Sequence, residues 1–455
     1  MNVTRFFFFC LIFTASLTAA SSDDSILVRL ETESQRLPIY MPHFSCDDSG
    51  FPGGYCTKLE KVLQFDLDHN GMTYLLDTTV NKEKLATAKD LDQAPRPADW
   101  KAIGAFYVVK VQVKDRKLFV RLFSSNDGTA KSIDNLSLTG DLSSDRKQIH
   151  QLADTIHKAL FGTDGIASTR VLYTVKTKQG STWNSEVWEA DYDGENIRPL
   201  TTNSGYSVTP IYVPPKSGYT AGTFFFVSYK TGQPKIYYQA LSDDAVPRRL
   251  TLLRGNQLMP AISRQRNRIA FISDVTGNPD LFVQDFSPDA GAIGKPYQIF
   301  SAHLSTQGSP TFSPDGRQIA FVTNKDGSPR IYTIDVPPPG TSLNSIKPTL
   351  LTKRNRESTA PAWSPDGTKI AYCSVTQGVR QIWVYDFNTR EERQVTQGQG
   401  NKENPSWAPN SLHLIFNSSD ADACDVYMIN LNQPDAIRLT SGAGEKRFPS
   451  WEPRI

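Results

Sequence analysis

The heptapeptide Pro-Thr-Phe-Ser-Pro-Asp-Gly at residues 310–316 decides the fold, because close copies of it recur through the second half of the chain. A second copy, Pro-Ala-Trp-Ser-Pro-Asp-Gly, stands at residues 361–367, and a degenerate copy begins at Pro405. Proline presets a negative φ and glycine accepts a positive one, so Pro-Asp-Gly favours a tight turn. An alternating segment such as Ile319-Ala320-Phe321 follows the turn. The motif therefore predicts a β-hairpin.

The copies follow a regular period. The first prolines of the units fall at residues 210, 260, 310, 361, 405 and 449, so successive units are 44 to 51 residues apart. Many units end in Leu-Thr or Val-Thr, as at Leu351-Thr352. Each unit has room for four short strands, which is typical of one blade of a β-propeller.

A split unit predicts that the propeller closes. Residues 170–201 supply three strands without a first one, and Phe448–Ile455 supply a first strand without followers. Joining them gives six blades and removes the open sheet edges that would promote aggregation. The alternative, an open β-solenoid, would need a capping element that the sequence lacks. We therefore predict an all-β six-bladed propeller over residues 169–455, with the last blade closed by the C-terminal strand.

The first half has no such period and is predicted to be an α/β domain over residues 21–162, with a linker at 163–168. Apolar residues at helical spacing predict a short helix around Leu59–Leu63 and a longer helix from Asp145 to near Gly162. The expected strands are Ile26–Glu31, Leu37–Met41, Met72–Leu76, Ala105–Lys114 and Lys117–Ser124.

Residues 1–20 have the pattern of a secretory signal peptide. Arg5 precedes the apolar run Phe6–Phe13, and small residues extend to Ala20. The run is too short to span a membrane as a helix, and nothing after residue 20 reaches 18 consecutive apolar residues. We expect cleavage at Ala20 or Ser22; an uncleaved N-terminal anchor is the alternative.

Export places the remaining cysteines in an oxidising compartment. Cys46 and Cys56 bracket a turn-rich loop, and we favour a disulfide between them. Cys373 and Cys424 either form a second disulfide or remain buried thiols. Their spacing matches no zinc site.

Charge and motifs exclude several functions. The chain has 49 Lys+Arg against 47 Asp+Glu, a net charge of +2, which argues against a general nucleic-acid binder. Gly-x-Ser-x-Gly, His-Glu-x-x-His and the phosphate-binding glycine motifs are absent from the sequence. We therefore predict no catalytic residue, no metal and no cofactor.

Residues that resemble metal ligands have simpler interpretations. His150 and His157 share one helix face but lie two turns apart, too far to hold one metal, and we expect them to be partly exposed. Asp315 and Asp366 are interpreted as turn residues that bond their own backbone. The recurring tryptophans Trp363, Trp407 and Trp451 are interpreted as core between blades rather than a sugar-binding stripe.

A partner-binding rim is predicted at the residues just before each repeat proline. Connections from one blade to the next lie around one mouth of a propeller channel, and here they are polar and mixed in charge, as in a specific transient interface. We expect them to be loops. The candidates are Asn256, Met259, Thr306, Ser309, Glu357, Thr359, Ala360, Asn401, Glu403, Asn404 and Arg447.

The chain resembles the TolB family over nearly its whole mature length. The resemblance is carried by the two heptapeptides at 310–316 and 361–367, by Phe-Pro-Ser-Trp-Glu-Pro at 448–453 after a split blade, and by Trp100–Ala105 before a strand. Three features depart from the family pattern: the Cys46/Cys56 pair, the ending Arg454-Ile455, and the degenerate blade that begins at Pro210.

The resemblance implies a non-enzymatic, monomeric periplasmic scaffold of the Tol–Pal envelope system. Such a protein binds the peptidoglycan-associated lipoprotein at the propeller rim and the inner-membrane Tol proteins through its N-terminal region. It supports outer-membrane integrity and constriction at cell division. The N-terminal coupling segment maps to Ser21, Ser22, Asp23, Asp24 and Ser25.

Two alternatives are enzymes. A secreted propeller enzyme, either a metal-dependent hydrolase of the lactonase kind or a protein like a sugar dehydrogenase, would place acidic, Asn or His side chains around a metal in the channel. The propeller of a prolyl-peptidase-like enzyme would need a hydrolase domain after it, and none follows here.

Overall fold

The computed structural model describes residues 36–455, except 88–90, 94–95, 203–204, 243, 421–422 and 434. The predicted signal peptide, the segment Ser21–Ser25 and the predicted strand Ile26–Glu31 lie outside the described residues. Within the described part of the chain, no helix is both long enough and apolar enough to cross a membrane.

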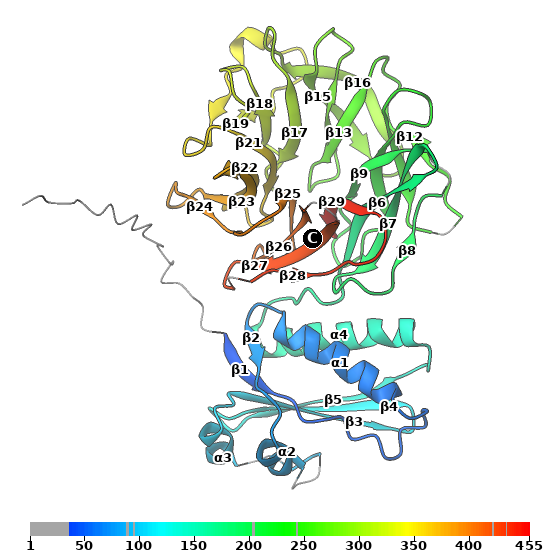
Figure 1. Ribbon diagram of the computed structural model, residues 1–455, viewed down its shortest axis with the longest axis vertical. Coiled ribbons are helices and arrows are strands. Elements are labelled where there is room, and N and C mark those ends of the chain that lie inside the picture. The colour runs from blue at the N-terminus through cyan, green and yellow to red at the C-terminus, as the bar shows by residue number, and fades with distance from the viewer. Residues whose placement is uncertain are drawn as a thin grey trace, which may run out of the picture. The chain divides into compact units, whose positions relative to one another are not determined.

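The N-terminal domain is built on one five-stranded sheet with the order β2-β1-β3-β4-β5. Strand β1 runs parallel to β2 and β3, whereas β3, β4 and β5 are antiparallel. Helices α1 and α4 cover one face, and α2 and α3 lie on the other (Figure 1). The elements are β1 (Leu37–Tyr40), α1 (Tyr55–Asp68), β2 (Thr73–Leu75), α2 (Val80–Thr87), α3 (Pro97–Ala102), β3 (Tyr107–Lys114), β4 (Lys117–Ser124), β5 (Ala130–Ser137) and α4 (Leu142–Phe161).

The elements predicted within the described residues of this domain are present, and three more were missed. Strand β5 was missed because most of its residues are exposed, so no buried face shows in its sequence. Helix α2 shows no apolar face, and α3 has only six residues. Helix α4 starts three residues before the predicted Asp145, because Asp141 caps it by accepting a hydrogen bond from the Ser144 N–H at 2.9 Å.

The C-terminal part is a six-bladed propeller of four-stranded antiparallel sheets, as predicted (Figure 1). Strand β29 pairs with β6, with Trp451 opposite Val171 and Ser450 opposite Leu172, so the C-terminal strand closes the split blade. The closing blade contains β29 (Glu445–Trp451), β6 (Arg170–Gln179), β7 (Thr182–Asp191) and β8 (Arg198–Pro199).

The other five blades follow in chain order. They are β9 (Ser207–Tyr212), β10 (Thr223–Ser228), β11 (Lys235–Ala240) and β12 (Arg248–Arg249); β13 (Gln257–Ile262), β14 (Arg268–Ser273), β15 (Asp280–Ser287) and β16 (Gly291–Phe300); β17 (Gln307–Phe312), β18 (Gln318–Thr323), β19 (Arg330–Asp335) and β20 (Thr349–Leu350); β21 (Ser358–Trp363), β22 (Lys369–Thr376), β23 (Val379–Asp386) and β24 (Glu392–Gln394); and β25 (Asn401–Trp407), β26 (His413–Ser419), β27 (Cys424–Asn430) and β28 (Ile437–Arg438).

The second strand of each blade carries the core. Ile319, Ala320 and Phe321 in β18 are all fully buried, although neighbouring residues of a strand point to opposite faces. Both faces are covered because each blade stands between two others, and clusters of apolar side chains join adjacent blades. The alternating Ile-Ala-Phe pattern therefore reports a sheet that is buried on both sides.

The segment 163–168 packs tightly where a linker was predicted. Ile166 and Ala167 are buried, and their surroundings include helix α4 and the closing blade. The Arg454 guanidinium donates to the Gly165 carbonyl at 2.5 Å and to the Asp154 carboxylate at 2.9 Å. The last residues of the propeller thus hold the end of α4 in place.

The four cysteines of the described chain are thiols in this structure. The Cys373 thiol donates to the Lys402 carbonyl at 3.3 Å, and the Cys424 thiol donates to the Lys446 carbonyl at 3.2 Å, so both are satisfied as buried thiols. Burial raises the pKa of the Cys46 thiol, and its hydrogen bond with Cys56 raises that pKa further. The thiols of Cys46 and Cys56 are therefore neighbours.

We predict that Cys46 and Cys56 form a disulfide when the protein is made in an oxidising compartment. Alkylation of the unfolded protein followed by mass spectrometry is expected to label Cys373 and Cys424 without reductant, and all four cysteines after reduction. Labelling of Cys46 and Cys56 without reductant would show that the pair stays reduced.

Acid is expected to destabilise the fold through His413. Its ring is fully buried, Nε2 has no hydrogen-bond partner, and burial lowers its pKa from 6.5 to about 3. Because the unfolded chain binds this proton first, stability is lost as pH falls from about 6.5 towards 3. The full shift corresponds to about 5 kcal/mol at most.

The measurement is the urea midpoint of unfolding between pH 7 and 4. His413→Gln should make the midpoint less dependent on pH, whatever it does to stability at pH 7. His303→Gln, at an exposed histidine, is the control and should leave the pH dependence unchanged. Equal pH dependence in the parent protein and His413→Gln would contradict the prediction.

Candidate functional site

The innermost strand of every blade is interrupted by a β-bulge at the residue before the repeat proline. In each case the pairing register with the next strand breaks at this point. Positive φ is uncommon for residues other than glycine, and a residue before proline normally prefers an extended backbone. The residues are Thr209 (φ 50°), Met259 (52°), Ser309 (44°), Ala360 (49°), Asn404 (55°) and Phe448 (53°).

Because the positive-φ bulge occurs in all six inner strands, it is a regular feature of the blade rather than a local irregularity. A bulge bends its strand and redirects the side chains next to it. Here it divides each inner strand into a half before the proline, which carries the predicted rim residues, and a half after the proline, which lines a cavity. The bulge thus separates the two candidate surfaces of the propeller channel.

The predicted rim residues are mostly in strands, so the expectation of loops is wrong. The strands could not be recognised from the sequence, because polar residues before a proline are also typical of turns. Asn256, Thr306 and Glu357 lie just before an inner strand. Met259, Ser309, Thr359, Ala360, Asn401, Glu403, Asn404 and Arg447 lie within β13, β17, β21, β25 and β29.

A chain of ion pairs connects three neighbouring blades at this rim. Glu403 receives hydrogen bonds from Arg380 at 2.9 Å and Arg447 at 3.5 Å. Arg447 also donates to Glu445 at 2.8 Å, and Lys176 approaches Glu445 at 3.3 Å. Burial acts to raise the pKa of Glu445, but the hydrogen bonds from Arg447 and Lys176 outweigh it and lower that pKa.

Other rim residues are held by neutral hydrogen bonds. The Asn404 amide donates to the Asn417 side chain at 2.9 Å, within one blade. The Ser309 N–H donates to Met259 Sδ at 3.0 Å, which connects two blades. The backbone N–H and the side-chain amide of Asn256 each donate a 2.6 Å hydrogen bond to the Asp274 carboxylate, within the same blade. The rim side chains are therefore already arranged before any partner binds.

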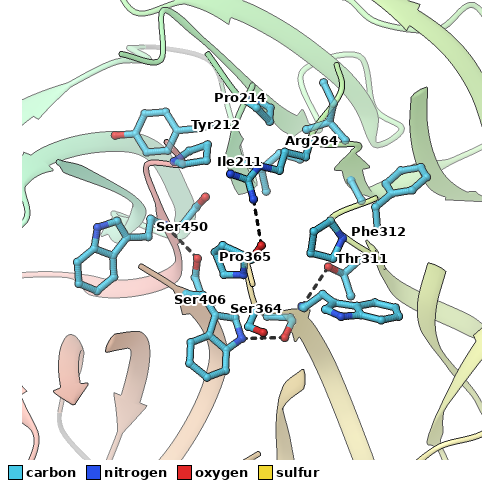
Figure 2. Close-up of a pocket in the computed structure, with 18 of the residues that line it drawn as sticks. Ile211, Tyr212, Pro214, Arg264, Thr311, Phe312, Ser364, Pro365, Ser406 and Ser450 are labelled. Atoms are coloured by element: carbon cyan, nitrogen blue, oxygen red, sulfur yellow. Dashed lines mark hydrogen bonds between the residues drawn. The ribbon is translucent and has the colours of Figure 1, made fainter. Parts of the chain in front are cut away.

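The parts of the inner strands that follow the repeat prolines line a cavity of about 320 Å³ in the propeller. Figure 2 shows Arg264 extending across this cavity to Pro365. The guanidinium donates to the Pro365 carbonyl at 3.0 Å and to the Arg454 carbonyl at 3.4 Å. Arg264 and Pro365 belong to blades that are not adjacent, so this side chain bridges the channel.

The recurring tryptophans belong to the core and also line this cavity. Trp407 and Trp451 are buried and Trp363 is half-buried. Trp407 Nε1 donates to the Ala362 carbonyl of the neighbouring blade at 2.9 Å. Sequence reasoning assigned these residues to the core and missed the cavity, although the repeated Pro-x-aromatic segments are its lining.

The aspartates of the repeated turns behave as expected. Asp315 accepts a hydrogen bond from the Arg317 N–H at 3.0 Å, and Asp366 accepts one from the Thr368 N–H at 2.9 Å. These bonds fix the turns that follow the cavity-lining strand halves.

A second polar site lies between α4 and the turn after β7. His150 and His157 were expected to be partly exposed, but they are 1% and 6% exposed because α4 packs against α1 and the closing blade. His150 Nδ1 lies 2.8 Å from the Asp66 carboxylate, and Nε2 faces Asp191 and Asp193. Of the described residues, His150, Asp191 and Asp193 are a group that could hold a metal ion.

Comparisons with known proteins agree with this architecture. One family profile, described as the TolB amino-terminal domain, matches residues 28–122, and another, described as the TolB beta propeller domain, matches residues 157–346 and 342–454. A "Protein TolB homolog" from Protochlamydia amoebophila is 55% identical over 399 residues, which cover 87% of this chain and 85% of that relative.

Two further relatives are more distant. A "Protein TolB homolog" from Chlamydia trachomatis serovar L2 is 37% identical over 87% of this chain and 83% of its own length. The crystal structure of TolB from Acinetobacter baumannii matches with a TM-score of 0.74 at 22% identity, covering 92% of this chain and 97% of that chain. The crystal structure shows the same fold.

Removing the Cβ atom at a bulge should relieve backbone strain. Ala360→Gly is expected to leave the free energy of unfolding unchanged or to raise it by up to about 1 kcal/mol, because glycine accepts positive φ. Ala362→Gly, two residues later in the same strand and outside the positive-φ set, should lower it by about 0.5–1 kcal/mol. Urea unfolding measures both. An equal loss in both variants would argue against strain at the bulge.

Proposed function

The chain belongs to the TolB family, whose members are non-enzymatic components of the Tol–Pal system, and on this premise we propose that it docks the peptidoglycan-associated lipoprotein on the propeller rim. The observation that carries the proposal is the chain of ion pairs through Glu403, Arg447 and Glu445 on neighbouring inner strands. These side chains are fixed in place and partly open to solvent, so a partner can reach them.

The exposure of the network supports a role in recognition. The side chains of Arg447 and Glu403 are 31% and 20% exposed, so each keeps hydrogen-bonding capacity for a partner. Charges of both signs at a rim favour a partner of complementary pattern and disfavour others. Because the side chains are already ordered, docking loses little side-chain entropy.

The cavity beyond the bulges supports the same mode of binding. It continues the channel behind the rim and is lined by prolines and tryptophans, which are rigid and apolar. Rigid aromatic surfaces with a few placed polar groups are typical of binding sites. A side chain projecting from the docked lipoprotein can enter it and meet Arg264.

The remaining roles follow the family resemblance. We propose that the chain acts in the periplasm after removal of residues 1–20, and that Ser21, Ser22, Asp23, Asp24 and Ser25 couple it to the inner-membrane Tol proteins. Together these contacts support outer-membrane integrity and constriction at division. The chain acts as a monomeric scaffold, with an α/β domain up to residue 162 joined to the propeller through residues 163–168.

Arg447→Ala should weaken binding of the lipoprotein's soluble domain about tenfold or more, because it removes the residue that joins Glu403 to Glu445. Calorimetry with the mature chain, from Ser21, measures the dissociation constant. Thermal unfolding of the variant checks that the propeller remains folded.

Arg317→Ala is the matched control. Arg317 is exposed and lies in the turn after β17, at the other end of the inner strands from the rim. Its loss should leave the dissociation constant unchanged. If both variants bind the lipoprotein domain more weakly, the binding site is not specific to this rim. If the parent chain does not bind the domain at all, the lipoprotein is not the partner.

A further inference from the structure

The imidazole of His150 is held in one orientation in the interior. Its side chain is 1% exposed, and Nδ1 lies 2.8 Å from the fully buried carboxylate of Asp66 on α1. Asp66 also accepts a hydrogen bond from the Tyr192 hydroxyl at 2.7 Å. A carboxylate on one ring nitrogen is the arrangement that orients a histidine ligand towards a metal on the other nitrogen.

The other ring nitrogen points at two carboxylates without bonding to them. Nε2 of His150 is buried and has no hydrogen-bond partner. It lies 3.6 Å from the nearest Asp193 oxygen and 3.8 Å from the nearest Asp191 oxygen. The three ligand atoms lie within 4.8 Å of one another. A metal about 2.0–2.2 Å from each ligand atom fits between groups at these separations.

The space between His150 Nε2, Asp191 and Asp193 is surrounded by acidic side chains. Asp66, Asp191 and Asp193 bring three carboxyl groups together around His150, and a cationic side chain, the Arg146 guanidinium, is in contact with Asp193. The carboxyl groups of Asp66 and Asp191 lie beside His150 in a poorly hydrated place. Buried charges need partners or a metal ion. A single divalent cation balances the group.

The end of β7, which carries Asp191, and the turn after it, which carries Asp193, are fixed in position. At Gly194 an added Cβ would lie 2.0 Å from the Leu439 carbonyl oxygen, so the backbone approaches the next blade too closely for a side chain. Asn196 donates to Asp191 at 2.5 Å and to the Ser143 carbonyl of α4 at 3.2 Å. These contacts hold the two carboxylates opposite His150.

We propose that His150 Nε2, Asp191 and Asp193 bind one zinc-class divalent transition-metal ion, which ties helix α4 to the turn after β7. One imidazole with two carboxylates suits zinc and its neighbours, whereas calcium and magnesium prefer all-oxygen sites with more ligands. The ion is structural: it bridges the α/β domain and the propeller at a buried position away from the channel. Asp66 is a positioning residue that orients the imidazole.

The test is metal binding by the full mature chain. Protein stripped with chelator, loaded with Zn²⁺ and passed through a desalting column should retain about one zinc per chain by elemental analysis. Added Zn²⁺ should raise the thermal midpoint by a few degrees, because it binds only the folded chain. Co²⁺ in the same site should give the visible absorption of a low-coordinate nitrogen–oxygen complex.

Variants distinguish this site from other histidines. His150→Gln should lose the retained zinc and the thermal shift, while His157→Gln, at a buried histidine two turns along the same helix, should keep both. Asp66→Asn should keep the stoichiometry but weaken zinc binding about tenfold to a hundredfold.

Three results would overturn the proposal. They are an unmodified chain that retains no zinc and shows no Co²⁺ absorption, a His150→Gln protein that retains zinc as the parent does, and an equal loss in His150→Gln and His157→Gln. The first would mean that a proton on His150 occupies the gap. The unmodified chain answers the question even if a variant fails to fold.

Discussion

The pairing of β29 with β6 closes the propeller into a ring. It joins residues about 280 positions apart and turns five complete units and one split unit into a ring. Glu452, 2% exposed, fastens the closure: its carboxylate accepts bonds from the Arg170 side chain at 2.6 and 3.0 Å and from the Ala221 N–H at 2.8 Å. Trp451 Nε1 donates to Thr169 at 2.8 Å beside it. Charged bonds of this kind are strong because they are shielded from water.

Closure also explains how the propeller forms a continuous rim around its channel. Once the ring is complete, each blade is covered on both faces, and the inner strands are the part of every blade that faces the channel. The bulges before the prolines then give these strands two different halves, one with polar and charged side chains and one with prolines and tryptophans. A single repeated backbone feature thus produces a polar rim and an apolar cavity behind it.

The two domains are joined by polar contacts as well as by apolar packing. Arg454 follows the closing strand β29 and donates a hydrogen bond to Asp154 on α4. Arg264, from the other side of the channel, donates to the Arg454 carbonyl. The His150 group is a second link, between α4 and the closing blade. Both links therefore attach the α/β domain to the blade that completes the ring.

The amino-acid sequence was enough to predict the blade count, the closure by the C-terminal strand, the Pro-Asp-Gly turns and the main helices of the first domain. These are encoded in short segments, because turn chemistry and side-chain alternation act over a few residues. It did not reveal β5, whose exposed residues leave no pattern, or the positive φ at Ala360, which polar and small residues before a proline do not signal. That Trp407 borders a cavity and that His150 faces Asp191 and Asp193 could be seen only in the folded chain. Such contacts join segments that lie far apart in the chain, and their geometry exists only after the ring has closed.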